Sequence, residues 1–379
     1  MTAPLDVLVV GLGAMGSATL LELARRGHRV TGIDRFAPPH SNGSSHGRSR
    51  IIREAYFEDP RYVPLVQRAY QRWQALEEEG GVTVFRRTGG LMLGTTGSAV
   101  VRGALASARE HDLPHEVLDA EAIRRRFPAF RLQDDEIGVF EPRAGTLDPE
   151  LAIATALRLA RQHGAELRLG ETVRSWRADG EGVEVVTDAG TLRVAHLVLT
   201  VGAWAPEVLR ELDVPFTVQR NLLFWFTPAA NPEQFAPGSL PVFIHETAPG
   251  AAWYGFPDVG DGVKVARHHH GEMTTPAALR RTVTDAELTA MRQILRTHMP
   301  GADGTLRETA ACMYTSVPDE HFVIDTHPAC PAVTVASPCS GHGFKFASAI
   351  GEVLADMATG RPVAFDRSLF ALARFAAGR

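Results

Sequence analysis

Lysine is the residue that this sequence of 379 amino acids most nearly lacks. Its 39 basic residues are 37 arginines and only two lysines, Lys264 and Lys345. A lysine ammonium is a compact point charge that can lose its proton when buried, whereas arginine stays charged and needs more room. Either lysine is therefore a candidate for a site that a guanidinium would not serve. The alternative is a GC-rich genome that has replaced the other lysines and left two by chance.

Other scarcities exclude whole classes of protein. Three cysteines, Cys312, Cys330 and Cys339, make an odd, sparse set unlike a secreted disulfide framework. No apolar stretch reaches the ~18 residues of a membrane helix, and the first residues run straight into a strand without a signal peptide. The net charge of −5, with no long basic block, argues against nucleic acid. We expect a cytoplasmic enzyme with neither a membrane nor a nucleic-acid partner.

The first forty residues follow the pattern of a dinucleotide-binding βαβ unit. A buried strand at 6–10 leads into a glycine motif at 11–16, a helix at 17–26 and a second strand at 29–33 that ends in Asp34. In such a unit the first two glycines let backbone amides approach a pyrophosphate at the start of the helix. The third lets helix and strand pack closely, and the acid binds a ribose hydroxyl. This order of features predicts a dinucleotide site.

The glycine motif alone does not distinguish a flavin from a nicotinamide dinucleotide. The opening of the chain also resembles that of β-hydroxyacid dehydrogenases, which use a nicotinamide cofactor and carry a catalytic lysine after a glycine-rich motif in mid-chain. No lysine occurs here before Lys264, and no such motif precedes it. The nicotinamide interpretation is therefore disfavoured.

The remaining elements predict an α/β protein with a discontinuous, Rossmann-like doubly wound domain. A helix at 151–163, a hairpin of strands at 182–187 and 191–194, a buried strand at 197–201 and a strand–turn–helix unit at 333–357 all fit this domain. The segments between them alternate in polarity and predict an interleaved second domain on an antiparallel sheet. The predicted boundaries are 1–83, 149–211 and 307–379 for the dinucleotide-binding domain, and 84–148 and 212–306 for the substrate domain.

Six short motifs stand in order along nearly the whole chain, at residues 38–47, 49–53, 254–257, 311–315, 319–325 and 340–345. Together they resemble the family of monomeric sarcosine oxidase and N-methyltryptophan oxidase, which are FAD-dependent amine oxidases. Several independent motifs in the right order are far more specific than the glycine motif alone. The resemblance implies that the dinucleotide is FAD.

The resemblance further implies a thioether between the flavin 8α-methyl group and Cys312. From the residues alone, Cys312 would be a small buried hydrophobe, the commonest fate of a free cysteine. Cys339 receives no role, although it directly precedes the glycine turn of the last motif. The cofactor-binding residues that match the family are Gly11, Gly13, Met15, Gly16, Asp34, Arg35, Ser44, Ser45, His46, Ser49, Arg50, Val173, Gly202, Trp204, Cys312, Met313, Gly341, Gly343, Phe344 and Lys345.

Lys264 matches the family's lysine that lies over the flavin and activates oxygen. A fixed cation there would stabilise the negative charge that develops on dioxygen. The alternative is a surface lysine on a strand. Arg50, by resemblance, packs against the flavin ring, and it would share a side with Arg53, three residues on, if the segment were helical.

Arg53 and Lys345 match the pair that grips the substrate carboxylate. Arginine binds a carboxylate bidentately, and a lysine opposite adds charge without demanding the same plane. Lys345 also stands in the first turn of the last predicted helix, whose amino end would place partial positive charge towards the flavin. The alternative for the arginines is ion pairing with Glu54 and Glu58.

The remaining matches line the family's substrate cavity. A run of three histidines, 268–270, could hold a metal, but consecutive strand residues point to alternate faces and no second ligand set is present, so we expect no metal. Its spacing of four residues from Lys264 selects His268 among the three. The matching residues are Tyr254, His268, Tyr314, Gly341 and His342.

The activity implied by the resemblance is oxidative demethylation of a secondary amino acid such as sarcosine. The products would be formaldehyde, the primary amino acid and hydrogen peroxide, with molecular oxygen as second substrate and a monomeric enzyme. Two alternatives stay open. The substrate could be another amino acid, such as N-methyltryptophan, a cyclic imino acid or glycine, or the chain could be a flavin-binding protein with little turnover.

Overall fold

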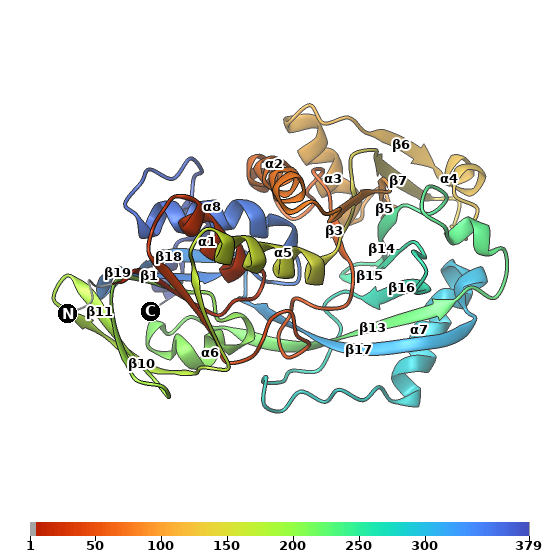
Figure 1. The fold of residues 1–379 in the computed structure, drawn as a ribbon. Helices are drawn as coiled ribbons and strands as arrows, with labels where there is room; N and C mark the ends of the chain where they lie inside the picture. The colour runs from red at the N-terminus through yellow and green to blue at the C-terminus, as the bar shows by residue number, and fades with distance from the viewer. Residues whose placement is uncertain (1–4, 379) are drawn as a thin grey trace.

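The fold is described from a computed structural model, in which residues 5–378 are described. Residues 1–4 and 379, the outermost residues of the predicted dinucleotide-binding domain, lie outside the described residues. Two eight-stranded sheets and one three-stranded sheet form the framework (Figure 1). The predicted α/β class is confirmed.

The first sheet corresponds to the predicted Rossmann-like domain. Its central strands β12, β1, β2 and β9 are parallel, and β19 pairs in parallel with the second half of β12. The order across the sheet is β10 (Val173–Asp179), β11 (Gly182–Thr187), β12 (Thr191–Leu199), β1 (Leu5–Val10), β2 (Val30–Asp34) and β9 (Glu166–Leu169), with β19 (Cys330–Ser337) and β18 (Val323–His327) beside β12.

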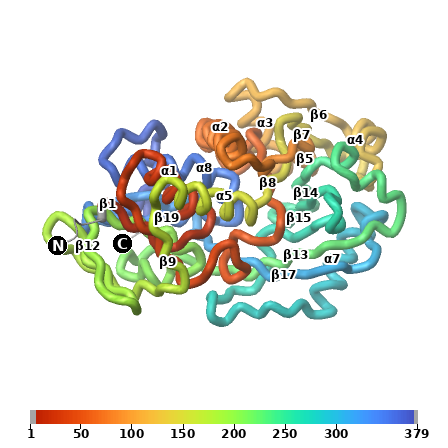
Figure 2. The backbone as a smooth tube through the Cα atoms, in the orientation of Figure 1, coloured from red at the N-terminus to blue at the C-terminus, as the bar shows by residue number. Residues whose placement is uncertain are grey.

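Both faces of this sheet are buried, which explains the continuous apolar run at its first strand. Val7 and Val9 pack in the core with α1 (Ala14–Arg25), α5 (Pro149–Gln162) and α8 (Ala347–Ala358), whereas Leu8 and Val10 pack on the other face. Figure 2 shows α1 and α8, from the two ends of the chain, lying side by side. The sheet is thus closed by segments that are more than 300 residues apart.

The second sheet is mainly antiparallel and forms the other half of the molecule. Its one parallel pair joins β14 to β5. The order is β17 (Thr305–Ser316), β13 (Thr217–Thr227), β16 (Val263–Arg267), β15 (Ala251–Phe256), β14 (Val242–Ala248), β5 (Gly90–Thr95), β7 (Glu136–Glu141) and β6 (Glu116–Asp119). The small sheet consists of β3 (Arg50–Ile52), β8 (Gly145–Leu147) and β4 (Phe85–Arg87). The remaining α-helices are α2 (Val63–Gly80), α3 (Ala99–Glu110), α4 (Ala120–Arg126), α6 (Ala205–Val208) and α7 (Asp285–His298).

Three local expectations differ from the structure. The strands predicted at 191–194 and 197–201 form one strand, β12, because its first half pairs with β11 and its second half with β19. Arg50 lies in strand β3, so Arg50 and Arg53 do not share a helical face. The last predicted helix begins with a short 3-10 turn, Phe344–Phe346, before α8.

Strand β17 crosses the predicted boundary at residue 307. It pairs along its length with β13 of the second sheet, so residues 307–316 belong to that sheet by hydrogen bonding. The domain boundaries themselves remain a prediction.

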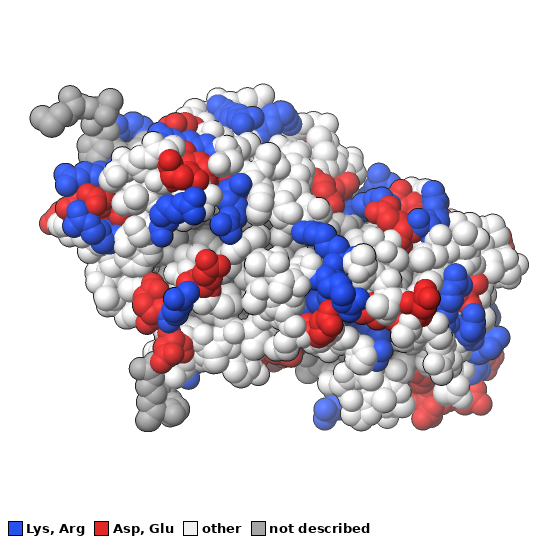
Figure 3. Space-filling model, turned by 90° about the horizontal axis from the view of Figure 1, so that it is seen from below, with Lys and Arg blue, Asp and Glu red and all other residues white. Residues whose placement is uncertain are grey.

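The surface carries charges of both signs. Figure 3 shows acidic and basic side chains interspersed over the face that is seen from below. No helix within residues 5–378 is long and apolar enough to cross a membrane.

Candidate active site

A cavity of about 910 Å³ lies where the two large sheets meet. It runs from Gly11 and Asp34, at the carboxyl ends of parallel strands, to Lys264 and Lys345. All residues that the sequence nominated for the site line this cavity, except Gly16 and His46. The structure therefore brings together residues that are spread over more than 330 positions of the chain.

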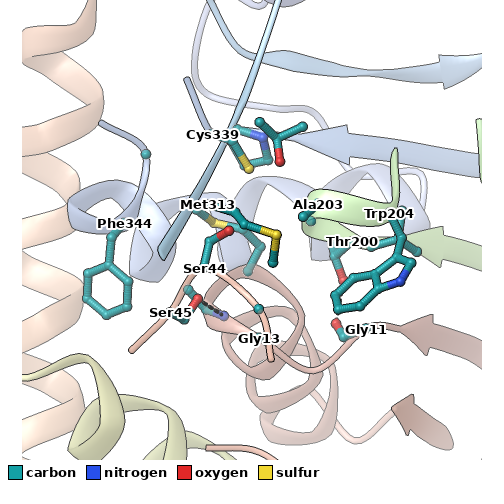
Figure 4. Close-up of a pocket in the computed structure, with 18 of the residues that line it drawn as sticks. Gly11, Gly13, Ser44, Ser45, Thr200, Ala203, Trp204, Met313, Cys339 and Phe344 are labelled. Atoms are coloured by element: carbon teal, nitrogen blue, oxygen red, sulfur yellow. Dashed lines mark hydrogen bonds between the residues drawn. The ribbon is translucent and has the colours of Figure 1, made fainter. Parts of the chain in front are cut away.

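The glycine turn between β1 and α1 lines one end of the cavity. Gly11 has a φ of +88°, and a Cβ there would stand 2.5 Å from the carbonyl oxygen of Thr200. Gly13 is the N-cap of α1 and makes no side-chain capping bond. Figure 4 shows Ser45 reaching this end, where its Oγ accepts a 3.4 Å hydrogen bond from the amide of Ala14. Because no N-cap side chain blocks this end of the helix, its backbone amides can bind a pyrophosphate.

The end of β2 suits the sugar of a dinucleotide. The buried Asp34 carboxylate accepts 2.8 Å hydrogen bonds from the amides of Leu12 and Phe36. A carboxylate can accept about four hydrogen bonds, so it retains capacity for a ribose hydroxyl. Next to it, the Arg35 guanidinium lies 5.4 Å from the ring of Trp204, which also lines the cavity.

Gly16 and His46 stand behind the cavity wall. A Cβ at Gly16 would lie 1.8 Å from the carbonyl oxygen of Gly11, so this glycine allows α1 to pack against the turn. His46 is buried and acts on the cavity through Cys312, whose pKa it lowers. Both residues therefore support the site without lining it.

Cys312 lies in β17 opposite Asn221 of β13, and its side chain is buried. Its Sγ is 3.5 Å from the Ser44 carbonyl oxygen and 3.8 Å from the Arg50 guanidinium. Burial raises the pKa of the thiol, but the hydrogen bond from His46 and the charge of Arg50 outweigh burial and bring the pKa to about 7. Because a thiolate is the reactive form of cysteine, Cys312 is set up as a nucleophile.

The other two cysteines have different surroundings. Cys339 also lines the cavity, but burial raises the pKa of its thiol to about 11. Cys330 lies in β19 and does not line the cavity. Cys312 is therefore the cavity cysteine with thiolate character.

Lys264 is buried in β16, which excludes the surface-lysine alternative. Its Nζ donates to the carbonyl oxygens of Gly47 at 2.7 Å and Ser49 at 2.8 Å, and to the Ser49 hydroxyl at 3.1 Å. The ring of Phe256 lies 4.6 Å from the same atom. Burial, together with the nearby Arg50, holds the pKa of Lys264 well below its usual value.

Arg50 stabilises the loop at residues 44–49, which lies beside Lys264. Its guanidinium donates to the carbonyl oxygens of Ser44 at 2.8 Å, His46 at 2.6 Å and Ser49 at 2.8 Å. Three backbone acceptors thus hold a cation beside Cys312 in the cavity wall.

Arg53 is buried between two aromatic rings and paired with an acid. Its guanidinium carbon lies 4.4 Å from the ring of Tyr56 and 4.3 Å from that of Phe57. One Nη donates to Glu58 at 2.6 Å and the other to the Ala55 carbonyl oxygen at 3.0 Å. The ion pairing expected as an alternative is therefore present for Glu58, yet Arg53 also lines the cavity.

Lys345 lies close to Arg53 at the same end of the cavity. Its Nζ donates to the carbonyl oxygen of His342 at 2.7 Å and lies 5.1 Å from the ring of Tyr56. Burial and the neighbouring Arg53 lower the pKa of Lys345 to about 7, although Glu58 opposes the shift. Burial would raise the pKa of Glu58, but Arg53, His342 and Lys345 together hold it near 2. Below pH 7, where Lys345 is protonated, two cations and one carboxylate leave a net positive charge.

His342 has both ring nitrogens engaged. Its Nε2 lies 3.0 Å from the carbonyl oxygen of Glu320, which can only accept, so Nε2 carries the proton. Burial lowers the pKa of His342 to about 4, so the ring is neutral and Nδ1 accepts from the hydroxyl of Tyr56. The ring is therefore fixed in orientation and tautomer.

Two tyrosines, a histidine and a glycine form the wall opposite the cations. The hydroxyls of Tyr254 and Tyr314 lie 3.2 Å apart, and the His268 ring lies 5.7 Å from that of Tyr314. A Cβ at Gly341 would stand 2.7 Å from the Tyr314 ring, and its φ is +76°. Burial holds the pKa of His268 well below its usual value, so this wall is neutral.

The run of three histidines does not assemble a metal site. His268 lines the cavity, whereas His269 and His270 do not. Within residues 5–378, no group of three or more metal-ligating side chains is placed to hold an ion.

Sequence reasoning missed several residues around Arg53. Tyr56 and Phe57 stand three and four residues after it, but the turn that folds them back onto its guanidinium has no motif. Glu58 was named only as the alternative ion-pair partner of Arg53 and not as a residue of the site. Ile244 of β14 and Leu223 of β13 also line the cavity. The alternation of β13 and β14 could have nominated these two as inward-facing residues, but not for this cavity.

Comparisons with known proteins agree with this geometry. The family model described as FAD dependent oxidoreductase matches residues 6–357. Monomeric sarcosine oxidase of Streptomyces avermitilis is 45% identical over 100% of this chain and 99% of its own length. N-methyl-L-tryptophan oxidase of Yersinia pestis is 38% identical over 98% and 99%. The structure of NikD, an unusual amino acid oxidase essential for nikkomycin biosynthesis, superimposes with a TM-score of 0.84 at 27% identity, covering 98% of each chain.

The matches extend over nearly the whole chain rather than over the glycine motif alone. They include both sheets and every wall of the cavity. The chain therefore belongs to the FAD-dependent oxidoreductases and, within them, to the family of monomeric sarcosine oxidase and N-methyl-L-tryptophan oxidase.

Proposed function

We propose that this chain catalyses the FAD-dependent oxidation of a secondary, N-methyl amino acid such as sarcosine. The products would be formaldehyde, the primary amino acid and hydrogen peroxide. One observation carries the proposal: the cavity that begins at a dinucleotide-type glycine turn ends at the buried cations Arg53 and Lys345, with Lys264 alongside. The similarity to sarcosine oxidase and N-methyl-L-tryptophan oxidase supports the substrate class.

FAD fits the residues that line the cavity. The open start of α1 at Gly13 would hold the pyrophosphate, and the Asp34 carboxylate would hold the ribose. FAD bound there would accept a hydride equivalent from the N-methyl carbon and pass the electrons to dioxygen. The protein supplies orientation and electrostatics around that chemistry.

Cys312 would hold the flavin through a thioether to its 8α-methyl group. The thiol has a pKa near 7 and lines the cavity, so a thiolate is available for bond formation. Joining a thiol to a methyl carbon releases two electrons and two protons, which dioxygen would take up as hydrogen peroxide. Arg50 and His46 contribute by stabilising the thiolate.

Arg53 and Lys345 would bind the substrate carboxylate. Both side chains are buried beside the Tyr56 ring and point into one end of the cavity. A carboxylate placed between a guanidinium and an ammonium makes charge-assisted hydrogen bonds to both. This anchoring fixes which end of the amino acid faces the cofactor.

The neutral wall would receive the amine in its deprotonated form. Tyr254, Tyr314 and His268 carry no charge there, because burial raises the pKa of both phenols and lowers that of the imidazole. A cavity that already holds two cations disfavours an ammonium. The free lone pair on nitrogen is what lets the substrate be oxidised to an imine, which water hydrolyses.

Lys264 would stabilise negative charge on dioxygen. In its protonated form all three N–H groups are bonded to Gly47 and Ser49, so the ammonium would act as a fixed charge and not as a ligand-binding donor. Negative charge developing nearby favours this form against the lowered pKa. A preorganised cation in a water-poor site needs no rearrangement as charge develops.

A product assay tests the activity. The purified yellow protein is given sarcosine, N-methyl-L-tryptophan, L-proline and glycine, and peroxide and formaldehyde are measured together. Equal amounts of both products from an N-methyl amino acid would support the proposal. Peroxide without formaldehyde, from proline or glycine alone, would assign a different substrate class, and no peroxide from any of them would contradict an oxidase.

Acid precipitation tests the covalent link. Flavin absorbance should stay with the wild-type pellet and move to the supernatant in Cys312→Ser. Cys339→Ser is the matched control, because it removes the other cavity thiol and should leave the flavin in the pellet. Release of flavin from the wild-type protein would contradict the thioether.

We also propose that the enzyme acts as a monomer in the cytoplasm. The relative that is 45% identical is named monomeric sarcosine oxidase, which supports a monomer. The three cysteines are free thiols, as expected in a reducing compartment. Sedimentation of the purified protein at a mass near 41.1 kDa would support the monomer, and a doubled mass would contradict it.

A further inference from the structure

A buried carboxylate outside the cavity holds the backbone next to Arg53. The chain leaves strand β3 after Ile52, so the amides that follow Arg53 have no strand partner. The amides of Glu54 and Ala55 both donate to the carboxylate of Glu141, one to each oxygen and both at 2.8 Å. Glu141 is the last residue of β7 and does not line the cavity.

The backbone of the same residue, Ala55, also contacts the guanidinium. The amide of Ala55 donates to Glu141, and the carbonyl oxygen of Ala55 accepts the 3.0 Å hydrogen bond from Arg53. The other Nη of Arg53 donates to Glu58. The direction of the guanidinium therefore depends on where Glu141 holds the Ala55 peptide.

Burying the Glu141 carboxylate costs free energy, which argues that it has a specific role. Its side chain is buried and forms no ion pair within residues 5–378. Burial raises the pKa of Glu141 to about 7, while the hydrogen bonds from the Glu54 and Ala55 amides oppose this shift and favour the carboxylate. A buried carboxylate without a cation costs free energy unless its oxygens are hydrogen-bonded. Two adjacent amides satisfy both oxygens, and a glutamine could satisfy only one, because its NH₂ group would face an N–H donor.

We propose that Glu141 is a positioning residue whose carboxylate holds the Glu54–Ala55 backbone and thereby aims Arg53 at the substrate carboxylate. This inference rests on the proposed role of Arg53. Glu141 touches neither substrate nor cofactor, so its effect should be seen in carboxylate recognition and not in electron transfer.

The test compares two ligands of equal shape. Methoxyacetate carries a carboxylate and methoxyacetamide does not, so the ratio of their dissociation constants, measured by flavin absorbance, reports carboxylate selectivity. Glu141→Gln should reduce this selectivity about tenfold, the effect of one lost charge-assisted hydrogen bond. It should also raise KM for the amino acid while leaving kcat within about threefold.

Glu54→Gln is the matched control. It replaces the neighbouring buried acid, whose side chain faces Arg143 and not the amides, so selectivity should change less than about twofold. Glu141→Asp provides a second variant in case the Glu141→Gln protein does not fold. Its shorter side chain keeps the carboxylate but cannot reach both amides in the same way, so carboxylate selectivity should fall as well.

An Arg53→Ala background separates the inference from the proposed function. There, Glu141→Gln should have no further effect on selectivity, because the group that it positions is gone. Loss of selectivity in Arg53→Ala but not in Glu141→Gln or Glu141→Asp would overturn this inference alone. Unchanged selectivity in Arg53→Ala would overturn the carboxylate assignment on which it rests.

Discussion

The two lysines differ in how many donors they leave for a ligand. Lys264 gives all three N–H groups to Gly47 and Ser49, whereas Lys345 has one acceptor within the described residues, the carbonyl oxygen of His342. Lys345 can therefore bond a carboxylate directly, and Lys264 can act only through its charge. This contrast explains why one enzyme would keep both residues as lysine in a chain otherwise rich in arginine.

Replacing Lys264 should separate the two halves of the proposed reaction. In Lys264→Met the cation is lost but the substrate site is intact, so reoxidation of the reduced protein by dioxygen should slow about 100-fold. Anaerobic reduction by substrate should change far less. Stopped-flow absorbance measures both rates, and Lys345→Met is the control, since it should weaken substrate binding without slowing reoxidation. Equal losses in both half-reactions would remove Lys264 from the oxygen step.

The charge of Lys345 should make carboxylate binding depend on pH. Its pKa is lowered to about 7, so the ammonium is present below that pH and lost above it. The titrating neighbours Glu58 and His342, with pKa values of about 2 and 4, keep their charge states across this range. Lys345 should therefore strengthen ligand binding only at pH values at which its ammonium is present.

The measurement is the ratio of the methoxyacetate dissociation constants of Lys345→Met and wild type. It should be about tenfold at pH 6 and fall towards one above pH 8, with a midpoint somewhat above 7 because the bound carboxylate favours the ammonium. Titrations common to both proteins cancel in the ratio. A ratio that stays near one at every pH would assign the carboxylate to Arg53 alone, and a constant ratio near ten would contradict the lowered pKa of Lys345.

At the scale of elements, the junction of β1 and α1 is one of the tight backbone contacts of the site. A Cβ at Gly16 would stand 1.8 Å from the Gly11 carbonyl oxygen, so α1 would have to move away from the turn in Gly16→Ala. We expect a loss of about 1–3 kcal/mol in stability from this overpacking, together with a reduced FAD content. Thermal unfolding and the ratio of flavin to protein absorbance measure the two effects.

Gly97→Ala is the control for this substitution. A Cβ at Gly97 would meet only the Thr95 hydroxyl, at 4.0 Å, so stability and flavin content should be nearly unchanged. Normal flavin content in Gly16→Ala would show that the turn tolerates a displaced helix.

Most elements could be predicted from the sequence because their patterns are local. The βαβ opening, the hairpin that turns at Asp188–Gly190 and the last helix need only period and turn residues, and all are present. Local patterns did not predict that β12 is one continuous strand or that Arg50 lies in a strand. They depend on pairing with β19 and β8, which lie far away in the sequence.

The residues of the candidate site also fall into those that sequence motifs predict and those that depend on long-range contacts. Residues in motifs, such as Gly11, Lys264 and Cys312, could be nominated through the family resemblance, and they do line one cavity. Glu58 could be named only as an alternative ion-pair partner of Arg53, because the turn that brings it there has no motif. Glu141 could not be named at all, because its effect on Arg53 arises from a strand end that only the folded chain brings to it. Long-range contacts without a motif leave no trace in a single sequence.

At the scale of the whole molecule, the cavity is lined by residues of both large sheets, for example Val10 of β1 and Cys312 of β17. Cofactor binding should therefore stabilise both halves together, since anything that binds only the folded state raises its stability. In Cys312→Ser, where FAD would be held without a covalent bond, the melting temperature should rise with added FAD. Free FAD at about 100 times its dissociation constant adds about 2.7 kcal/mol.

The wild-type protein supplies the comparison. With the flavin already attached, its melting temperature should not respond to added FAD. Calorimetry over a series of FAD concentrations measures both proteins, and a wild-type response equal to that of Cys312→Ser would contradict covalent attachment.

The burial of both lysines has a practical consequence for conjugation chemistry. Lys264 is 2% exposed and Lys345 5% exposed, and the sequence holds no other lysine. An amine-reactive dye or activated resin would therefore find no exposed lysine on the folded protein. A single lysine introduced in place of an exposed arginine would be the one reactive lysine of the folded protein, so that a dye or an electrode could be attached at a chosen position.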